Sequence, residues 1–171
     1  MRKFWNKTNF LLAFPVVVWA AWAVAVHLTV MNGAKTVLPV YGFDPRDILA
    51  GQYLAIRADY DSFPSECGRL TENDSANAFF CVGENRIVLN KSDCSGRFIA
   101  GYCEQNGRFR DVSISRFYVS EKSARMLEKA VNNRVKNPQA VVSADKNGRA
   151  YPVDLILDGL PYKEWLKTAV K

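Results

Sequence analysis

Residues Phe10 to Val30 read FLLAFPVVVWAAWAVAVHLTV, a run of 21 residues without a formal charge. At about 1.5 Å per residue, a helix of this length spans a hydrocarbon layer about 30 Å thick. Arg2, Lys3 and Lys7 precede the run, and the first nine residues contain no acidic side chain. Because basic flanks stay on the cytoplasmic side of a membrane, this pattern predicts a single-pass anchor with a cytoplasmic N-terminus and an exported remainder.

A cleaved signal peptide is the alternative interpretation of the same run. The segments Ala21-Trp-Ala23 and Ala23-Val-Ala25 have the small-x-small form that signal peptidase cuts. The apolar run continues beyond both of them, however, and it exceeds the apolar region of a typical signal peptide, which has about 7–15 residues. We therefore favour a retained anchor.

The anchor divides the chain into four expected parts: a cytoplasmic tail (1–9), the anchor (10–30), a connector (31–43) and one extracytoplasmic domain (44–171). The chain has 23 basic and 17 acidic side chains. Three of the basic residues precede the anchor, so the rest of the chain holds 20 basic against 17 acidic residues. This mild excess of positive charge does not predict a nucleic-acid partner.

All four cysteines, Cys67, Cys81, Cys94 and Cys103, follow the anchor. An exported domain would place them in an oxidising compartment such as a periplasm, where disulfides form. Four cysteines allow three pairings, and the sequence alone does not choose among them. We favour Cys67–Cys81 and Cys94–Cys103, because each closes a short local loop. No CxxC pair is present and the only histidine, His27, lies in the anchor, so we expect neither a metal nor a cofactor.

The domain carries the patterns of short antiparallel strands. In Gln52–Tyr60, apolar side chains at every second position from Leu54 predict a half-buried strand. Three further pairs of segments flank turn sequences and predict hairpins: 78–82 with 86–90, 97–103 with 108–115, and 140–144 with 149–157. Two of the turns contain Asn-Gly, in which both residues tolerate positive φ. Pro152 predicts an edge or a bulge in its strand.

One segment has the periodicity of an amphipathic helix. Glu121 to Val135 places four apolar side chains on one face, and Ser120 stands at the N-cap position. Residues 162–170 suit a short final helix of the same kind. The predicted fold class is therefore α+β, with one N-terminal transmembrane helix followed by a mainly antiparallel β domain that carries one amphipathic helix.

Residues Asp44 to Tyr60, DPRDILAGQYLAIRADY, resemble the bacterial family of membrane-anchored proteins named for its GDYxxLxY motif. The family pattern has a Pro-Arg-Asp segment just before the motif. The positions that match are Pro45, Arg46, Asp47, Gly51 and Tyr53. The positions that depart are Gln52 in place of aspartate, Ile56 in place of leucine and Ala58 in place of the second tyrosine. These departures put in doubt any role that needs the aspartate charge or the second hydroxyl.

Two later stretches extend the resemblance. Residues 114–119, ISRFYV, are similar to a family segment with an aromatic pair that enters a helix, and 145–149, DKNGR, are similar to its closing hairpin. The resemblance implies a single anchor and an extracytoplasmic β-rich domain, in a family whose members often occur with multi-spanning membrane proteins. It transfers no catalytic residue, because the family has no established activity.

The function we expect is that of a non-catalytic accessory domain that binds a multi-spanning membrane protein. The Pro45–Tyr53 corner is the candidate contact, although it could serve only to fix a loop against the core. The alternative function is a membrane-tethered hydrolase laid out like a signal peptidase, which uses a Ser–Lys pair. Ser62 and Ser65 lie in a predicted loop and Lys91 adjoins Ser92, but no serine follows the anchor in a matching motif.

Overall fold

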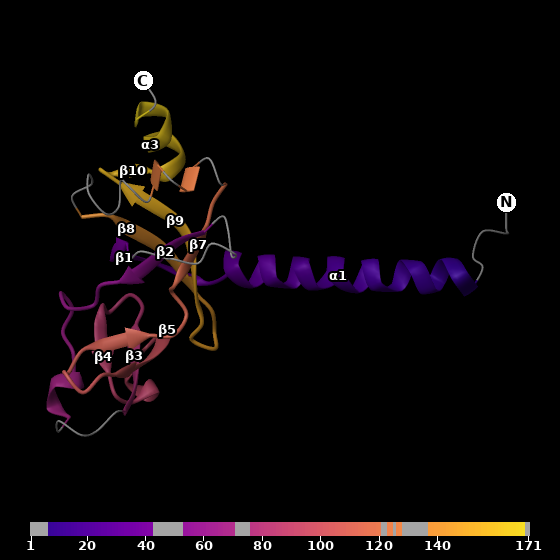
Figure 1. Cartoon of the computed structure of the whole chain (residues 1–171). Coiled ribbons are helices and arrows are strands. Elements are labelled where there is room, and N and C mark those ends of the chain that lie inside the picture. The colour runs from indigo at the N-terminus through magenta and orange to yellow at the C-terminus, as the bar shows by residue number, and fades with distance from the viewer. Residues whose placement is uncertain are drawn as a thin grey trace. The chain divides into compact units, whose positions relative to one another are not determined.

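The computed structural model describes residues 7–42, 53–70, 76–120, 123–124, 126–127 and 137–169. The chain forms two compact units, Met1–Gly33 and Ala34–Lys171, and each is described by itself (Figure 1). The first unit contains helix α1 (Lys7–Met31). The stretch Ala13–Met31 has a mean hydropathy of 1.9, and its side chains are exposed from residue 13 to residue 29. This helix is long and apolar enough to cross a membrane, as the sequence predicts.

The second unit begins at Ala34, within the segment 31–43 that the sequence analysis treats as a connector. Strand β1 (Ala34–Gly42) pairs with strand β8 (Gln139–Ala144) as far as Pro39 and with strand β2 (Tyr53–Ala58) from Val40 onward. Pro39 has no N–H to donate, and it lies where β1 changes partner. This position explains how a proline fits into an interior strand, and it places β1 inside the domain.

The strands form two antiparallel sheets (Figure 1). The first has the order β10-β9-β8-β1-β2-β7 and includes β7 (Arg116–Tyr118), β9 (Ala150–Leu157) and β10 (Leu160–Pro161). The second has the order β4-β3-β5-β6, with β3 (Ala76–Cys81), β4 (Arg86–Val88), β5 (Phe98–Cys103) and β6 (Phe109–Asp111). The remaining named elements are the 3₁₀ helices η1 (Cys67–Arg69) and η2 (Lys91–Asp93) and the helix α3 (Tyr162–Ala169). The α+β fold class is confirmed.

The three predicted hairpins are confirmed as β3–β4, β5–β6 and β8–β9. The Asn-Gly turns place Gly107 at φ +76° and Gly148 at φ +83°, which is the conformation that makes this dipeptide a hairpin signal. Pro152 lies at a bulge, because the pairing of β8 with β9 shifts between Val141 and Val142.

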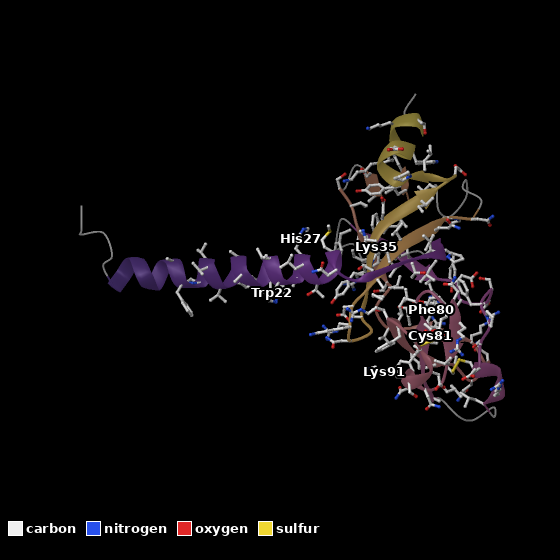
Figure 2. All side chains as sticks on the ribbon, turned by 180° about the vertical axis from the view of Figure 1, so that it is seen from behind. Trp22, His27, Lys35, Phe80, Cys81 and Lys91 are labelled. Carbon is white, nitrogen blue, oxygen red and sulfur yellow. A yellow bond between two sulfur atoms is a disulfide. The ribbon has the colours of Figure 1, made fainter. Side chains whose placement is uncertain are left out.

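The core collects the inward side of β2 together with side chains from both sheets. Leu54, Ile56, Ala58 and Tyr60 are all buried, as their alternation predicts. Phe80, labelled in Figure 2, is among the largest fully buried side chains. Burial of such groups contributes about 25 cal/mol per Å² of apolar surface, which makes this cluster the main source of stability.

The predicted helix at 121–135 is described in part. Ser123, Ala124, Met126 and Leu127 are helical, and Leu127 is fully buried. The N–H groups of Ser123 and Ala124 each donate to the Ser120 carbonyl oxygen at 2.9 Å, so Ser120 lies at the helix start as expected. The other positions of this helix lie outside the described residues. The predicted tail helix is confirmed as α3.

The favoured disulfide pairing is wrong. The bonds are Cys67–Cys103 and Cys81–Cys94. In the β3–β5 pair, Cys81 lies opposite Phe98 and Cys103 lies opposite Ala76, so these two cysteines stand at opposite ends of the pair. Five residues of strand separate the ends by roughly 16 Å. Cys67 in η1 meets the Cys103 end and therefore cannot reach Cys81. Two disulfides remain typical of an oxidising compartment.

Candidate functional site

The predicted Pro45–Tyr53 corner is described only at its end. Pro45, Arg46, Asp47, Gly51 and Gln52 lie outside the described residues. Ile56 is fully buried, and its N–H donates to the Ser115 carbonyl oxygen at 3.2 Å. Its side chain therefore supports the core. Tyr53 begins β2 and is half-buried, so it is the described motif position that reaches the surface.

The structure brings together the motif strand, β2, and the ISRFYV segment at 114–119, which contains β7. Tyr53 lies opposite Tyr118, and Ala55 lies opposite Arg116, because β2 and β7 are neighbours. The two tyrosine rings are 6.2 Å apart, and the Arg116 guanidinium lies 4.8 Å from the centre of the Tyr53 ring. The motif strand and the ISRFYV segment thus form one surface.

This surface continues along β2 to β1. Arg57 shares the side of β2 that carries Tyr53, since the residues alternate, and it lies opposite Tyr41. Its guanidinium is 5.9 Å from the centre of the Tyr41 ring. We call the surface made by these side chains the aromatic–arginine face; it consists of Tyr41, Tyr53, Arg57, Arg116 and Tyr118.

The composition of the aromatic–arginine face is typical of a binding surface. Tyrosine and arginine are enriched where proteins meet, because each combines a large contact area with polar groups. The Tyr118 side chain is 70% exposed at the end strand of its sheet. Arg116 forms no ion pair with any residue that the structure describes, and it is exposed.

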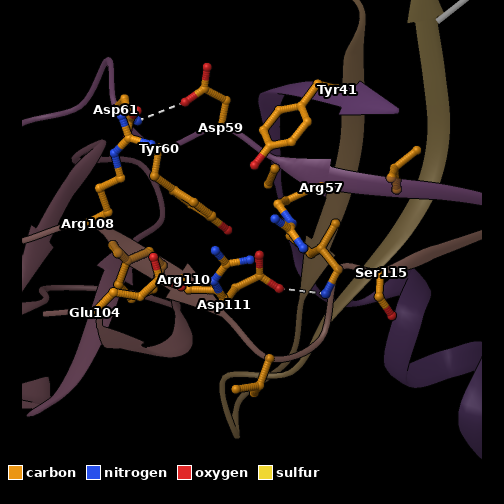
Figure 3. A pocket seen from close by; sticks show the side chains of 15 residues that line it. Tyr41, Arg57, Asp59, Tyr60, Asp61, Glu104, Arg108, Arg110, Asp111 and Ser115 are labelled. Carbon is orange, nitrogen blue, oxygen red and sulfur yellow. Dashed lines mark hydrogen bonds and ion pairs between the residues drawn. The ribbon is translucent and has the colours of Figure 1, made fainter. Parts of the chain in front are cut away.

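A second feature is a cavity of about 290 Å³ where the end of β2 meets β6. We call it the two-sheet cleft. Its charged lining residues are Arg57, Arg108 and Arg110 on the basic side and Asp59, Asp61, Glu104 and Asp111 on the acidic side (Figure 3). Among its apolar lining residues are Phe109, Val112 and Ile114. The cleft thus draws residues from both sheets.

Arg108 and Arg110 of the two-sheet cleft are engaged by acidic neighbours. Arg110 forms an ion pair with Glu104, and this hydrogen bond lowers the pKa of the glutamate and raises the pKa of the arginine. Arg108 pairs with Asp61 at 3.3 Å on an exposed rim. Such rim pairs contribute little to stability, but they neutralise the charges locally.

Tyr60 is buried and Asp111 is half-buried, so both are less exposed than the pair Arg108–Asp61 at the rim. Asp111 Oδ1 accepts hydrogen bonds from the N–H groups of Ser113 and Ile114, at 2.9 and 2.6 Å. Burial raises the pKa of the Asp111 carboxyl, and these N–H groups partly offset the rise. Tyr60 is 3% exposed, and its hydroxyl has no hydrogen-bond partner of acceptable geometry among the described residues. Burial and then the negative charge of Asp111 raise the pKa of Tyr60.

The sequence contains a signal for the inward position of Tyr60 and Asp111. Tyr60 continues the apolar side of the predicted strand, and Asp111 follows the buried Phe109 by two positions, which puts a carboxylate on an inward-facing side. An acidic residue at such a position needs a partner or marks a site. Which residue it would face could not be known without the packing of the two sheets.

A comparison of the sequence with known protein families identifies the family of this chain. A sequence model described as GDYXXLXY protein matches residues 15–155 of this chain. The chain belongs to the GDYXXLXY family. The match covers most of α1, all of the four-stranded sheet and the six-stranded sheet except β10 and the end of β9, so it includes the aromatic–arginine face and the two-sheet cleft. No curated protein and no solved structure gives a significant match.

Lys91 and Ser92, which the alternative hydrolase hypothesis considers, both lie in η2 of this GDYXXLXY-family domain, and each contacts another group. The Lys91 ammonium lies 4.8 Å from the centre of the Phe98 ring, and the Ser92 hydroxyl donates to Asp93. Ser65 Oγ accepts a hydrogen bond from the N–H of Cys67. The hydroxyls of Ser65 and Ser92 therefore interact with a backbone N–H and a carboxylate rather than with a lysine ammonium.

Proposed function

We propose that the chain is a membrane-anchored accessory domain that binds a multi-spanning protein of the bacterial inner membrane. In this proposal, α1 is retained as the anchor, the N-terminus is cytoplasmic, and the two-sheet domain lies in the periplasm. The observation that carries the proposal is the position of Tyr53. This motif residue lies at the surface beside Arg116 and Tyr118, on a face rich in the residue types that dominate binding energies.

The anchor supports this reading by its effect on association. A domain held at the membrane meets an integral partner at a high effective concentration, so a modest contact surface gives a stable complex.

The positive charge of the aromatic–arginine face favours a partner with negative charge. Arg57 and Arg116 lie on the face, and the exposed Lys35 is on the same side of β1 as Tyr41. An extracytoplasmic segment of the partner with acidic residues would complement it.

Affinity capture of the full-length protein from its native membrane, after chemical crosslinking, tests the proposal. We expect one multi-spanning protein in stoichiometric amount with the unchanged chain. Tyr53→Ala should reduce its recovery by about tenfold or more, because truncation of a central aromatic residue costs about 2 kcal/mol in typical interfaces. Arg116→Gln should also reduce recovery while it leaves the strand intact.

Tyr102→Ala is the matched control. Tyr102 is a tyrosine of β5, in the other sheet, and its side chain is 37% exposed. It should recover the partner as well as the unchanged chain does. Circular dichroism of each purified variant verifies that the domain is folded. Recovery of no integral membrane protein above background would reject the accessory function.

A further inference from the structure

We propose that the end of the domain at which β1 begins docks on anionic phospholipid headgroups of the membrane that holds α1. The docking surface consists of Lys91, Val112, Lys146 and Arg149, and we call it the basic end. The inference rests on the retained anchor of the proposed function but not on its protein partner. The basic end contains none of the residues of the aromatic–arginine face.

The basic end lies where the chain enters the domain. Ala34 begins β1 and pairs with Ala144 of β8, which also pairs with Ala150 of β9. The turn between β8 and β9, at 145–149, therefore stands at the same end of the sheet as the first residue of β1. Only two residues separate Ala34 from Met31, the end of α1, and three Cα–Cα steps span at most about 11 Å. An anchored α1 thus keeps this end of the sheet within reach of the lipid headgroups.

The cations of the basic end come from both sheets. The Lys91 ammonium (Figure 2) lies 4.8 Å from the centre of the Phe98 ring, and a Cβ atom built on Gly148 would lie 2.8 Å from Cδ2 of the same ring. Lys146 and Arg149 lie on either side of Gly148 in the turn. All three cationic side chains are exposed, and the ion pairs of the described residues include none of them.

The acidic residues beside these cations leave the surface positive. Asp145, in the turn, is 5% exposed, and its Oδ1 atom accepts the N–H groups of Asn147 and Arg149 at 2.7 and 3.0 Å. Asp93, in η2 with Lys91, is exposed and accepts the hydroxyl of the preceding serine. The turn and η2 therefore carry three exposed cations against one exposed acid among their described residues. Such a surface is attracted to anionic lipids.

An exposed apolar side chain accompanies the cations. Val112 is 70% exposed, and the hydroxyl of the next residue, Ser113, accepts the N–H of Ala150 at 3.1 Å. Because Ala150 directly follows Arg149, Val112 belongs to the same end of the domain. Asp111, on its other side, is half-buried, and its Oδ1 atom accepts two backbone N–H groups. Binding to a membrane surface grows with buried apolar area and with attraction to anionic lipids. An acidic protein would pair with the cations alone, so the valine favours the membrane.

Photocrosslinking of the full-length protein, in nanodiscs that contain no other integral membrane protein, tests this assignment. A photoreactive phenylalanine replaces Val112 in one variant and the exposed Asn147 in another, and mass spectrometry measures the lipid adducts. The discs contain either phosphatidylcholine alone or an equal mixture of phosphatidylcholine and phosphatidylglycerol. We expect adducts from both positions, with about fivefold more or greater in the mixed discs, because each basic residue near an anionic surface strengthens the association by about this factor. Position 160, at the other end of β9, should give none.

Lys146→Gln together with Arg149→Gln should reduce the adducts in mixed discs to the level in phosphatidylcholine alone. Lys163→Gln together with Lys167→Gln is the matched control, since it removes the same charge from exposed positions of α3, and it should leave the adducts unchanged. Equal adducts in the two kinds of disc overturn the assignment. So does a yield that the Lys146 and Arg149 substitutions leave unchanged in a variant that circular dichroism shows to be folded.

Absence of lipid adducts from both positions 112 and 147 also overturns the assignment, and it is the result expected if the basic end binds an acidic protein instead. The discs hold no protein partner, so this result would leave the accessory function intact. Failure to capture a partner through the aromatic–arginine face would, in turn, leave the lipid contact intact.

Discussion

The turn between β8 and β9 reaches the other sheet through Gly148. The Ala100 N–H of β5 donates to the Gly148 carbonyl oxygen at 2.9 Å. Gly148 has φ +83°, and a Cβ atom built on it would lie 2.8 Å from Cδ2 of Phe98 and 3.2 Å from Cβ of Ala100. Both the backbone conformation and the close approach to β5 therefore require glycine at this position. Gly148 thus makes one of the contacts between the six-stranded and the four-stranded sheet.

Substitution of Gly148 by alanine should destabilise the domain strongly. Positive φ at a non-glycine residue costs about 1–3 kcal/mol, and overpacking against Phe98 adds about 1–3 kcal/mol. We expect the free energy of unfolding to fall by about 2–5 kcal/mol in the full-length protein. Urea unfolding followed by circular dichroism measures this change.

Gly159→Ala separates the two causes, because Gly159 has a similar φ of +80° but no atom within 4 Å of an added Cβ. It should cost about 1 kcal/mol, from backbone strain alone. Equal losses for Gly148→Ala and Gly159→Ala would show that the contact with Phe98 contributes nothing.

At the scale of elements, the two disulfides lie at opposite ends of the four-stranded sheet. Cys67–Cys103 fixes η1 to the end of β5 across 36 residues, and Cys81–Cys94 fixes the end of β3 to the segment after η2 across 13 residues. The longer loop removes more conformational freedom from the unfolded chain. Sequence proximity favoured another pairing, because it takes no account of the strand register that separates Cys81 from Cys103.

Replacement of both cysteines of one bond by alanine should therefore show a difference between the bonds. From loop length alone, loss of Cys67–Cys103 should lower the free energy of unfolding by about 4 kcal/mol and loss of Cys81–Cys94 by about 3 kcal/mol. Urea unfolding under non-reducing conditions measures both. Peptide mapping of the unreduced protein is the direct check, and a peptide that links Cys67 to Cys81 would contradict the described pairing.

The elements that could be predicted from the sequence are those with local signals. The Asn-Gly turns at 106–107 and 147–148 determine two hairpins, and the alternation from Leu54 to Tyr60 determines the buried side of β2. Strand β1 was predicted only as part of a connector, because the two strands that pair with it are distant in sequence. The change of partner at Pro39 involves residues about 20 and 100 positions away, at Ala58 and Gln139, and no local pattern encodes it.

The same limit applies to the candidate sites. Tyr53 was identified from its motif position, but the neighbours that make it part of a surface, Arg116 and Tyr118, lie more than 60 residues away in sequence. The two-sheet cleft likewise forms where β2 and β6 meet, and its buried pair of Tyr60 and Asp111 is separated by 51 positions. Residue types could be recognised from the sequence, whereas their juxtaposition depends on the pairing of distant strands.

In the proposed function, the whole molecule combines a candidate membrane helix with a disulfide-bonded domain that has one surface for a partner. In the proposed function, an anchor that holds the domain beside a membrane partner would make a small contact surface sufficient. The domain therefore needs only to present the aromatic–arginine face. That requirement is met by β2 and β7 at one side of the six-stranded sheet.

Site-specific photocrosslinking in intact cells tests this central claim most directly. A photoreactive phenylalanine replaces Tyr118, which is 70% exposed on β7, and in a separate variant it replaces Leu160, which is 38% exposed on β10 at the opposite edge of the same sheet. We predict a light-dependent adduct with one multi-spanning membrane protein from position 118 and none from position 160. No adduct from position 118, or the same adducts from both positions, would contradict the account.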